Sequence, residues 1–277
     1  MHRPYSFFKY KSGGSGDNDH FTVIAHRGAS AYYPENTIES FEGAINLGAE
    51  MIELDVQLSR DGEVVVFHDE KINRCTNGRG KLAAYSLAQL KNLDAGSWFG
   101  RKFKGAKIPK LDEVLDLCRD KIAVNIEIKT ESVADELSCG IEERCLNIVE
   151  KHGMRRHVVF SSFDPRALKH LKEIDQSVAV AVLYEKKIYR DKIPSEIVAL
   201  FGADCFNCAL KELSKKKLAD LKEHGISANV YTVDIKSGML CLMEAGVEGI
   251  FTNKPDILKK AADEFRQRAK EIARKRR

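Results

Sequence analysis

Short apolar segments recur along this sequence, and each is followed by a stretch in which apolar residues return every three or four positions. The first pattern is typical of buried β-strands and the second of amphipathic helices. Eight segments have the strand pattern: residues 21–25, 51–56, 122–129, 158–161, 178–183, 203–207, 228–233 and 249–252. Strands and helices that alternate in this way form a parallel sheet, and eight such units close into an α/β fold, the TIM (β/α)8 barrel. The chain of 277 residues has the length of one such domain.

The helical pattern predicts the outer layer of this barrel. In residues 35–47, for example, Ile38, Phe41 and Ala44 share one face of a helix. The other predicted helices span residues 111–118, 132–151, 165–174, 194–201, 214–224 and 237–245. These helices would connect consecutive strands of the barrel.

One region interrupts the alternation of strands and helices. Residues 60–63, Arg-Asp-Gly-Glu, predict a tight turn, after which the apolar residues 64–67 return antiparallel to the strand 51–56. Residues 69–110 then lack periodicity except for a short helix near 86–91. A loop of this length in a compact domain is usually functional or has structure of its own. We therefore predict a small cap-like insertion over the mouth of the barrel.

Composition limits the class of protein. Hydrophobic residues make up 43% of the chain, enough for a large core. No apolar run is long enough to cross a bilayer, and Lys9 and Lys11 interrupt the only apolar residues that could resemble a signal peptide. The seven cysteines form no paired framework, and the single CxxC, Cys205 to Cys208, lacks a second pair that would indicate zinc. We expect a cytoplasmic protein with reduced cysteines and no stable membrane insertion.

Positive charge is concentrated at the C-terminal end. The net charge is +4, and residues 266–277 contain seven Lys or Arg and one Glu, a net of +6, which leaves −2 for the rest. A body of that charge does not predict a nucleic-acid-binding surface. We interpret 266–277 as a basic tail that extends a terminal helix into solvent, with contact to anionic lipid or nucleic acid as the alternative. Residues 1–20, with Gly13-Gly14-Ser15-Gly16, predict a flexible tail, so the barrel would span 21–265.

Acidic residues share one face of the second predicted strand. In 51–56, Glu53 and Asp55 point to the same side, and the apolar residues between them point to the other. Two carboxylates on a buried strand repel each other, and a divalent cation is the commonest way to hold them there. Glu127 and Lys129 end a later strand, and the carboxyl ends of barrel strands meet at one mouth. Three carboxylates therefore predict a site for Mg²⁺ or Ca²⁺, with a solvated strand face as the alternative.

Two histidines lie at strand ends near these acids. His26 follows the first strand, and His68 follows the hairpin strand 64–67. Because imidazole changes its charge near neutral pH, two histidines beside a carboxylate cluster predict a general acid–base pair. A structural role is the alternative for either histidine taken alone.

Short motifs surround these residues in a fixed order. They are His26-Arg27-Gly28, Pro34-Glu35-Asn36-Thr37, Glu53-x-Asp55, Asp61-Gly62, His68-Asp69, Asn73-Arg74-Cys75-Thr76, Leu93-Asp94-Ala95-Gly96, Ile108-Pro109 and Ile126-Glu127-Ile128-Lys129. Their order and spacing resemble the glycerophosphodiester phosphodiesterase family, over roughly residues 21–258. The resemblance implies a TIM barrel with a small insertion and a divalent cation. It also implies hydrolysis of glycerophosphodiesters, such as glycerophosphocholine or glycerophosphoethanolamine, to glycerol 3-phosphate and an alcohol.

The resemblance implies a role for each charged residue at the predicted mouth. Glu53, Asp55 and Glu127 would hold the cation, Mg²⁺ or Ca²⁺. Arg27 and Lys129 would bind the phosphate of a small-molecule glycerophosphodiester. The insertion 69–110, as the segment long enough to reach the mouth, would influence which leaving alcohol is accepted.

The resemblance also implies that one histidine activates the attacking oxygen and the other protonates the leaving alcohol. We assign His26 as the base and His68 as the acid, an order that the sequence leaves open. The attacking oxygen, from water or from the glycerol 2-hydroxyl, stays open as well. Family members often end the seventh strand with tryptophan, whereas this chain has Tyr231, which keeps an aromatic wall but changes its packing against glycerol.

The sequence leaves two other functions open. One is a lysophospholipase D or sphingomyelinase D-like phosphodiesterase that acts on lipids, and the Glu127-x-Lys129 pair favours the soluble substrate over it. The other is a catalytically silent barrel that binds a phosphodiester, and the intact His26 and His68 argue against it. The oligomeric state is not predicted.

Overall fold

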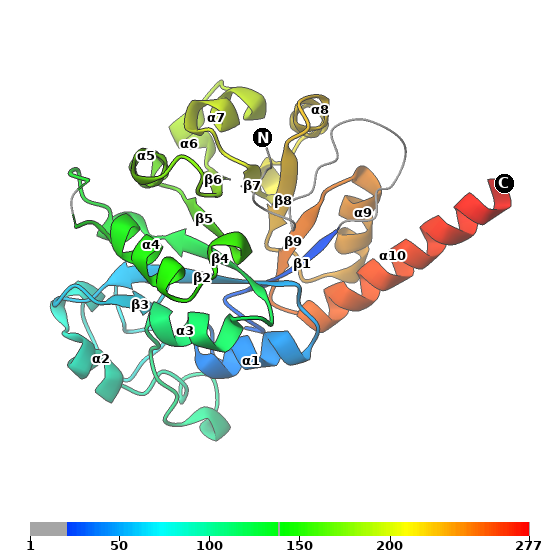
Figure 1. Cartoon of the computed structure of the whole chain (residues 1–277). Helices are drawn as coiled ribbons and strands as arrows, with labels where there is room; N and C mark the ends of the chain where they lie inside the picture. The colour runs from blue at the N-terminus through cyan, green and yellow to red at the C-terminus, as the bar shows by residue number, and fades with distance from the viewer. Residues whose placement is uncertain (1–20, 138, 277) are drawn as a thin grey trace.

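The strands of the computed structural model, which describes residues 21–137 and 139–276, form a closed barrel (Figure 1). Eight parallel strands pair in the order β1-β2-β4-β5-β6-β7-β8-β9, and β9 pairs with β1 to close the sheet. Their bounds are β1 Thr22–His26, β2 Met51–Leu58, β4 Ala123–Ile128, β5 Val158–Ser162, β6 Val180–Tyr184, β7 Cys205–Ala209, β8 Ser227–Tyr231 and β9 Gly249–Thr252. The predicted (β/α)8 fold is therefore confirmed.

Helices surround this barrel and cover the outward side chains of the strands (Figure 1). They are α1 Ile38–Asn46, α3 Leu111–Cys118, α4 Ile141–Lys151, α5 Pro165–Ile174, α6 Lys186–Tyr189, α7 Pro194–Phe201, α8 Lys215–Glu223, α9 Lys236–Ala245 and α10 Pro255–Arg276. Ile52 and Leu54 of β2 belong to the cluster beneath the helices, whereas Met51 belongs to a separate cluster inside the barrel. Since side chains alternate along a strand, Glu53 and Asp55 follow Met51 into the barrel interior.

Two predicted helix boundaries are wrong, and local contacts explain both. The helix predicted over 132–151 starts only at Ile141, because Ser132 accepts a hydrogen bond from the Leu58 backbone and holds its segment against β2. The helix predicted from residue 35 starts at Ile38 after the N-cap Thr37. Asn36 has a left-handed φ of 57° and cannot belong to that helix.

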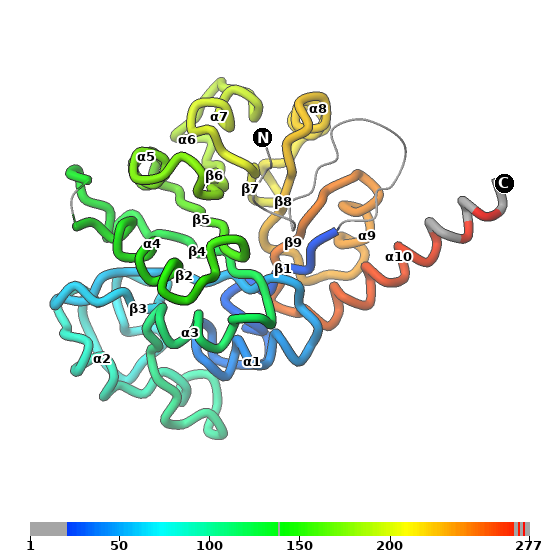
Figure 2. Tube along the Cα trace, in the orientation of Figure 1, coloured from blue at the N-terminus to red at the C-terminus, as the bar shows by residue number. Residues whose placement is uncertain are grey.

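The insertion builds a small hydrophobic core of its own. β3, Val64–Val66, pairs antiparallel with β2 as predicted, and α2, Leu87–Asn92, supplies the short helix. This core contains Ile72, Cys75, Leu82, Leu90, Ala95 and Ile108 of the insertion, together with Val65 and Phe67 of the hairpin segment before it. The segment lies beside α1 and α3 (Figure 2), and the Phe103 ring packs 5.6 Å from the ring of Tyr33. Its effect on the choice of leaving alcohol stays a prediction.

The two ends of the chain differ in what the structure describes. The predicted flexible tail, residues 1–20, lies outside the described residues. The helix α10 continues past the barrel (Figure 1), but Arg266 at the start of the predicted basic tail still binds the barrel through the Phe21 carbonyl oxygen. Among the described residues, no helix is both long and apolar enough to cross a membrane. All seven cysteines have free thiols, as predicted.

Candidate active site

Three carboxylates meet on the inward faces of β2 and β4, two from within β2 and one from near the end of β4. Strand register pairs Asp55 with Glu127, and it pairs His26 of β1 with Glu53. One oxygen from each of Glu53, Asp55 and Glu127 can be chosen so that all three lie within 4.8 Å of one another. The structure therefore brings together the three acids that the sequence proposed as cation ligands.

Two cations flank these acids. The Lys129 Nζ lies 2.7 Å from Glu127 and 3.5 Å from Asp55, and the Arg27 Nε lies 3.4 Å from Asp55. The backbone N–H of Arg27 also donates to Glu53 at 2.8 Å. Three carboxylates and two cations leave the group at a net charge of −1.

The turn after β1 explains why Arg27 is followed by glycine. Arg27 and Gly28 have φ values of 55° and 80°, and this left-handed pair points the Arg27 N–H at the β2 carboxylate. A Cβ on Gly28 would lie 2.7 Å from the Ser40 backbone carbonyl carbon, so only glycine fits here. The His-Arg-Gly motif is thus a turn that directs the Arg27 backbone N–H to Glu53 of the carboxylate cluster.

The three carboxyl groups have different pKa values because their surroundings differ. Burial and repulsion by Asp55 raise the pKa of Glu53 well above its usual value, and the same two causes raise the pKa of Glu127. Burial also acts to raise the pKa of Asp55, but the charges of Arg27 and Lys129 outweigh it and lower that pKa. Protons and a cation would therefore compete for Glu53 and Glu127.

The donor set fits a hard divalent cation. The Asp55 Oδ1 is buried without a hydrogen bond and has only the 3.5 Å ion pair with Lys129 Nζ, whereas its Oδ2 accepts from Asn36 Nδ2 at 2.8 Å. A buried carboxylate oxygen without a hydrogen bond is costly, and a bound cation would offset that cost. Glu53, Asp55 and Glu127 offer only oxygen ligands, which Mg²⁺ and Ca²⁺ prefer.

His26 is held by an amide. Its Nδ1 lies 2.8 Å from Asn253 Oδ1, and Asp234 orients that amide by accepting from the Asn253 Nδ2 at 2.7 Å and the Asn253 backbone N–H at 2.8 Å. Because the amide oxygen can only accept, His26 Nδ1 carries the proton and Nε2 keeps a lone pair. Burial and the charge of Arg27 lower the pKa of His26 to about 4, so the ring is neutral at pH 7.

His68, in contrast, is held by a carboxylate. Its Nδ1 lies 2.6 Å from Asp69 Oδ1, and because a carboxylate can only accept, His68 Nδ1 is the donor in this contact. Arg74 donates to both oxygens of Asp69 and, on its other side, to both oxygens of Glu35. Glu35 also accepts from Arg27 Nη1 at 2.8 Å, so one chain of ion pairs joins His68 to Arg27.

Tyr231 lies at the end of β8, as expected. Its hydroxyl donates to the Tyr184 carbonyl oxygen at 3.3 Å, and its ring makes edge contacts with Phe163 and Phe251. Burial raises the pKa of Tyr231, and the nearby Glu127 charge adds to this shift. All eight residues proposed from the sequence therefore lie at one end of the barrel.

Several residues of the site lacked a predicted role. Glu35, Asn36, Asp69 and Arg74 stand inside recognised motifs, but the sequence does not show that they bind one another. Asp234 follows β8 by three positions, and a polar residue just after a barrel strand was the available signal for it.

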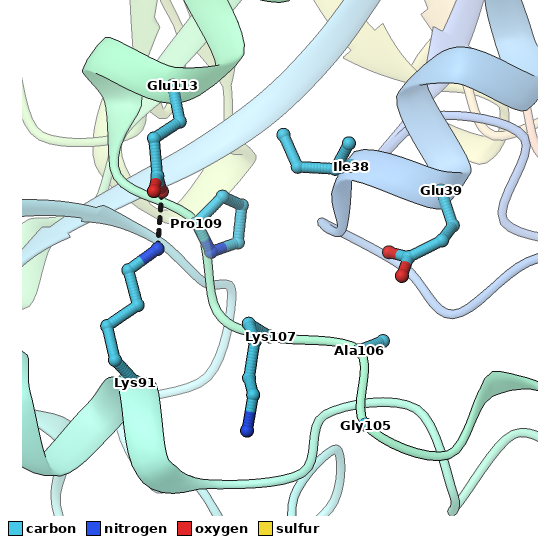
Figure 3. A pocket seen from close by; sticks show the side chains of 8 residues that line it. All are labelled: Ile38, Glu39, Lys91, Gly105, Ala106, Lys107, Pro109 and Glu113. Carbon is cyan, nitrogen blue, oxygen red and sulfur yellow. Dashed lines mark hydrogen bonds and ion pairs between the residues drawn. The ribbon is translucent and has the colours of Figure 1, made fainter.

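A separate pocket of about 490 Å³ lies outside the barrel, between α1, α3 and the insertion (Figure 3). Ile38 and Glu39 line one side, and Lys91 pairs with Glu113 on the other. None of Glu53, Asp55, Glu127, His26 and His68 lines this pocket. The candidate active site is therefore the carboxylate cluster in the barrel, not this pocket.

Comparison with known families agrees with the geometry. A model described as the glycerophosphoryl diester phosphodiesterase family matches residues 26–257. The fold and the matched segment together define a phosphoric diester hydrolase. The chain belongs to the glycerophosphoryl diester phosphodiesterase family.

Relatives with known names and structures support this assignment. The chain is 39% identical to a glycerophosphodiester phosphodiesterase of Caldanaerobacter subterraneus subsp. tengcongensis, over 85% of this chain and 95% of the relative. A glycerophosphodiester phosphodiesterase of Bacillus subtilis is 34% identical, over 87% and 86%. An Oleispira antarctica phosphodiesterase, solved in complex with the product sn-glycerol-3-phosphate, is 28% identical with a TM-score of 0.78, over 88% of this chain and 97% of that one.

Proposed function

We propose that this enzyme hydrolyses soluble glycerophosphodiesters, such as glycerophosphocholine or glycerophosphoethanolamine, to glycerol 3-phosphate and an alcohol. The observation that carries the proposal is the cluster of Glu53, Asp55 and Glu127, flanked by two cations and two differently held histidines. The Oleispira antarctica neighbour, which binds sn-glycerol-3-phosphate, supports the identity of the product. The test is the release of glycerol 3-phosphate from glycerophosphocholine with and without added divalent cation.

Charge balance suits a phosphodiester. Glu53, Asp55 and Glu127 would hold Mg²⁺ or Ca²⁺, which when bound would neutralise a phosphate oxygen and offset charge that develops during the reaction. The five protein groups sum to −1, so a divalent cation brings the site to +1. A phosphodiester carries one negative charge, and Arg27 and Lys129 are the side chains that would bind it.

The partners of the histidines support different roles for them. His26 is neutral, with Nδ1–H held by Asn253 and the Nε2 lone pair free, which is the state that a general base needs. His68 donates Nδ1–H to the Asp69 carboxylate, a charged partner in place of the amide that holds His26, and we assign His68 the role of the general acid. His26 would remove the proton from the attacking oxygen, and His68 would protonate the leaving alkoxide.

The proposal extends to the setting of the enzyme. Seven free thiols agree with a reducing compartment, so we propose the cytoplasm. The similarity to named glycerophosphodiester phosphodiesterases does not favour a lipid as the substrate that is cleaved. Tyr231 would form one wall of the glycerol pocket.

Replacing Lys129 by Met should slow turnover by roughly 10²-fold, because a fixed positive charge that stabilises the developing phosphorane is lost. The side chain keeps its bulk, and a bound cation still compensates Glu127, so the melting temperature in saturating Mg²⁺ should change little. Steady-state kinetics and thermal melting on one preparation check this. Lys129→Arg, which keeps the charge, is the matched control. A large fall in melting temperature with normal kinetics per folded molecule would assign Lys129 to stability through its ion pair with Glu127.

Replacing Asn253 by Ala should lower kcat by about 10- to 100-fold, the usual range for a group that orients a functional side chain. KM should change less, because Asn253 contacts His26 and Asp234 in this structure. Ser30→Ala is the control, since Ser30 donates to the same Asn253 oxygen without binding the His26 ring. Unchanged kcat in the Asn253 variant would mean that His26 needs no external support.

A further inference from the structure

The segments that follow β6 and β7, which include the short helix α6 and the start of α8, concentrate positive charge. We call residues 185–193 and 210–217 the basic rim. It contains eight Lys or Arg and three Asp or Glu, a net of +5, although the whole chain has a net charge of only +4. The cations are Lys186, Lys187, Arg190, Lys192, Lys211, Lys215, Lys216 and Lys217, and all except the last are exposed. The rim is therefore a local positive surface on a chain whose remainder sums to −1.

The same segments expose aliphatic side chains. Ile188, Ile193 and Leu210 are 38%, 37% and 45% exposed, and Ile235 on the neighbouring loop after β8 is 72% exposed. Among the described residues eight large hydrophobic side chains are exposed, and five of them, these four and Leu137, lie in the segments that connect a barrel strand to the long outer helix after it, Ile188 within the short helix α6. Single exposed apolar residues are normal on any surface, but a group of them on one rim is a feature of interaction sites.

The basic rim is continuous and borders the mouth. The Lys186 backbone N–H donates to Glu212 Oε1 at 3.3 Å, which joins its two segments. Ala209, just before the second segment, pairs in register with Tyr231. Because both segments follow carboxyl ends of barrel strands, they lie at the same end of the barrel as the three carboxylates.

We propose that the basic rim docks reversibly on anionic phospholipid bilayers, with its aliphatic tips among the headgroups and its lysines on lipid phosphates. Exposed lysines beside aliphatic tips match the charge and the apolar layer of such a surface. Single-stranded nucleic acid is a poorer match, since it needs exposed aromatic rings, and Tyr189 in the rim is buried. Docking would bring the mouth close to the membrane where deacylated phospholipids arise.

Sedimentation of the full chain with lipid vesicles tests this proposal. Vesicles of phosphatidylcholine with phosphatidylglycerol should bind the protein, more weakly at high salt, and vesicles of pure phosphatidylcholine should not. The double variant Lys211→Gln/Lys216→Gln should lose about 25-fold in affinity, about five-fold for each charge near the surface. The double variant Ile188→Ser/Leu210→Ser should also bind more weakly.

Two variants serve as matched controls. Leu200→Ser removes an aliphatic side chain that is 56% exposed on the outer helix α7, and Arg268→Gln/Arg274→Gln removes two exposed charges from α10. Both should bind anionic vesicles like the wild type. Turnover of glycerophosphocholine in solution should be unchanged in every rim variant, so a failure of docking is separable from a failure of the proposed reaction.

Three results would overturn the proposal. The first is equal binding to anionic and neutral vesicles. The positive charge of the basic rim would then indicate an acidic protein as its partner. The second is normal binding after removal of the two rim lysines. The third is a loss of binding confined to the Arg268/Arg274 variant, which would place the membrane contact on α10.

Discussion

Chelation of divalent cations with EDTA should abolish turnover, and Mg²⁺ or Ca²⁺ should restore it. Three carboxylates with oxygens within 4.8 Å of one another are costly to hold without a divalent cation, because Arg27 and Lys129 supply only two positive charges against their three negative ones. The same cation would neutralise the bound phosphate, so its loss removes substrate binding and charge stabilisation together. Full turnover in metal-free buffer would exclude the metal site.

A binding measurement can separate the cation from the reaction. A ligand at 100 times its dissociation constant stabilises the folded state by about 2.7 kcal/mol, which should raise the melting temperature by several degrees. Glu53→Gln should lose most of this cation-dependent rise. The matched control is Glu142→Gln, a change at a buried glutamate that pairs with His170 away from the mouth, which should keep it. An equal cation effect in both variants would place the cation elsewhere.

The dependence on pH has a defined sign. Burial and repulsion by Asp55 raise the pKa values of Glu53 and Glu127, so protons occupy these groups at a higher pH than they occupy ordinary carboxylates. A cation binds the deprotonated forms, and its stabilising effect should therefore decrease as the pH falls through these raised pKa values. Melting curves with and without Mg²⁺ across that range would show a constant difference if neither glutamate were a ligand.

Periodicity predicts the parts of this site that belong to regular strands. Alternation in residues 51–56 places Glu53 and Asp55 on one face, and parallel pairing brings Glu127 beside them. The same reasoning predicts where His26 and Tyr231 lie, because each ends a strand. These positions follow from local rules together with closure of the sheet.

Local rules of this kind do not predict contacts between irregular segments. Arg74 of the insertion binds Glu35 across 39 positions, and Asp234 orients Asn253 across 19. Neither residue lies in a strand, so no period places its side chain. The wrongly predicted helix over 132–140 has a similar origin, since the hydrogen bond between Ser132 and Leu58 spans 74 positions. Turns and caps depend on partners that only the folded chain brings together.

Replacing either histidine by Ala should lower turnover by about 10²- to 10⁴-fold, the usual contribution of a general acid or base, while the fold persists. His224→Ala is the matched control, because that histidine is half exposed and binds the Asp220 backbone within α8 and its cap. Activity within a few-fold of the wild type in either active-site variant would make that histidine structural.

The leaving group can distinguish the two histidines. A glycerophosphodiester with p-nitrophenol as its alcohol needs little protonation when the bond breaks, because nitrophenolate is a weak base. His68→Ala should therefore recover much of its activity on this substrate, since only the proton donation proposed for the Asp69-bound His68 is bypassed. His26→Ala should stay inactive on both substrates, because the attacking oxygen still has to lose its proton to the neutral ring that Asn253 holds. Recovery of the His26 variant instead would reverse the two roles, and recovery of neither would show that the leaving alcohol takes its proton from another group.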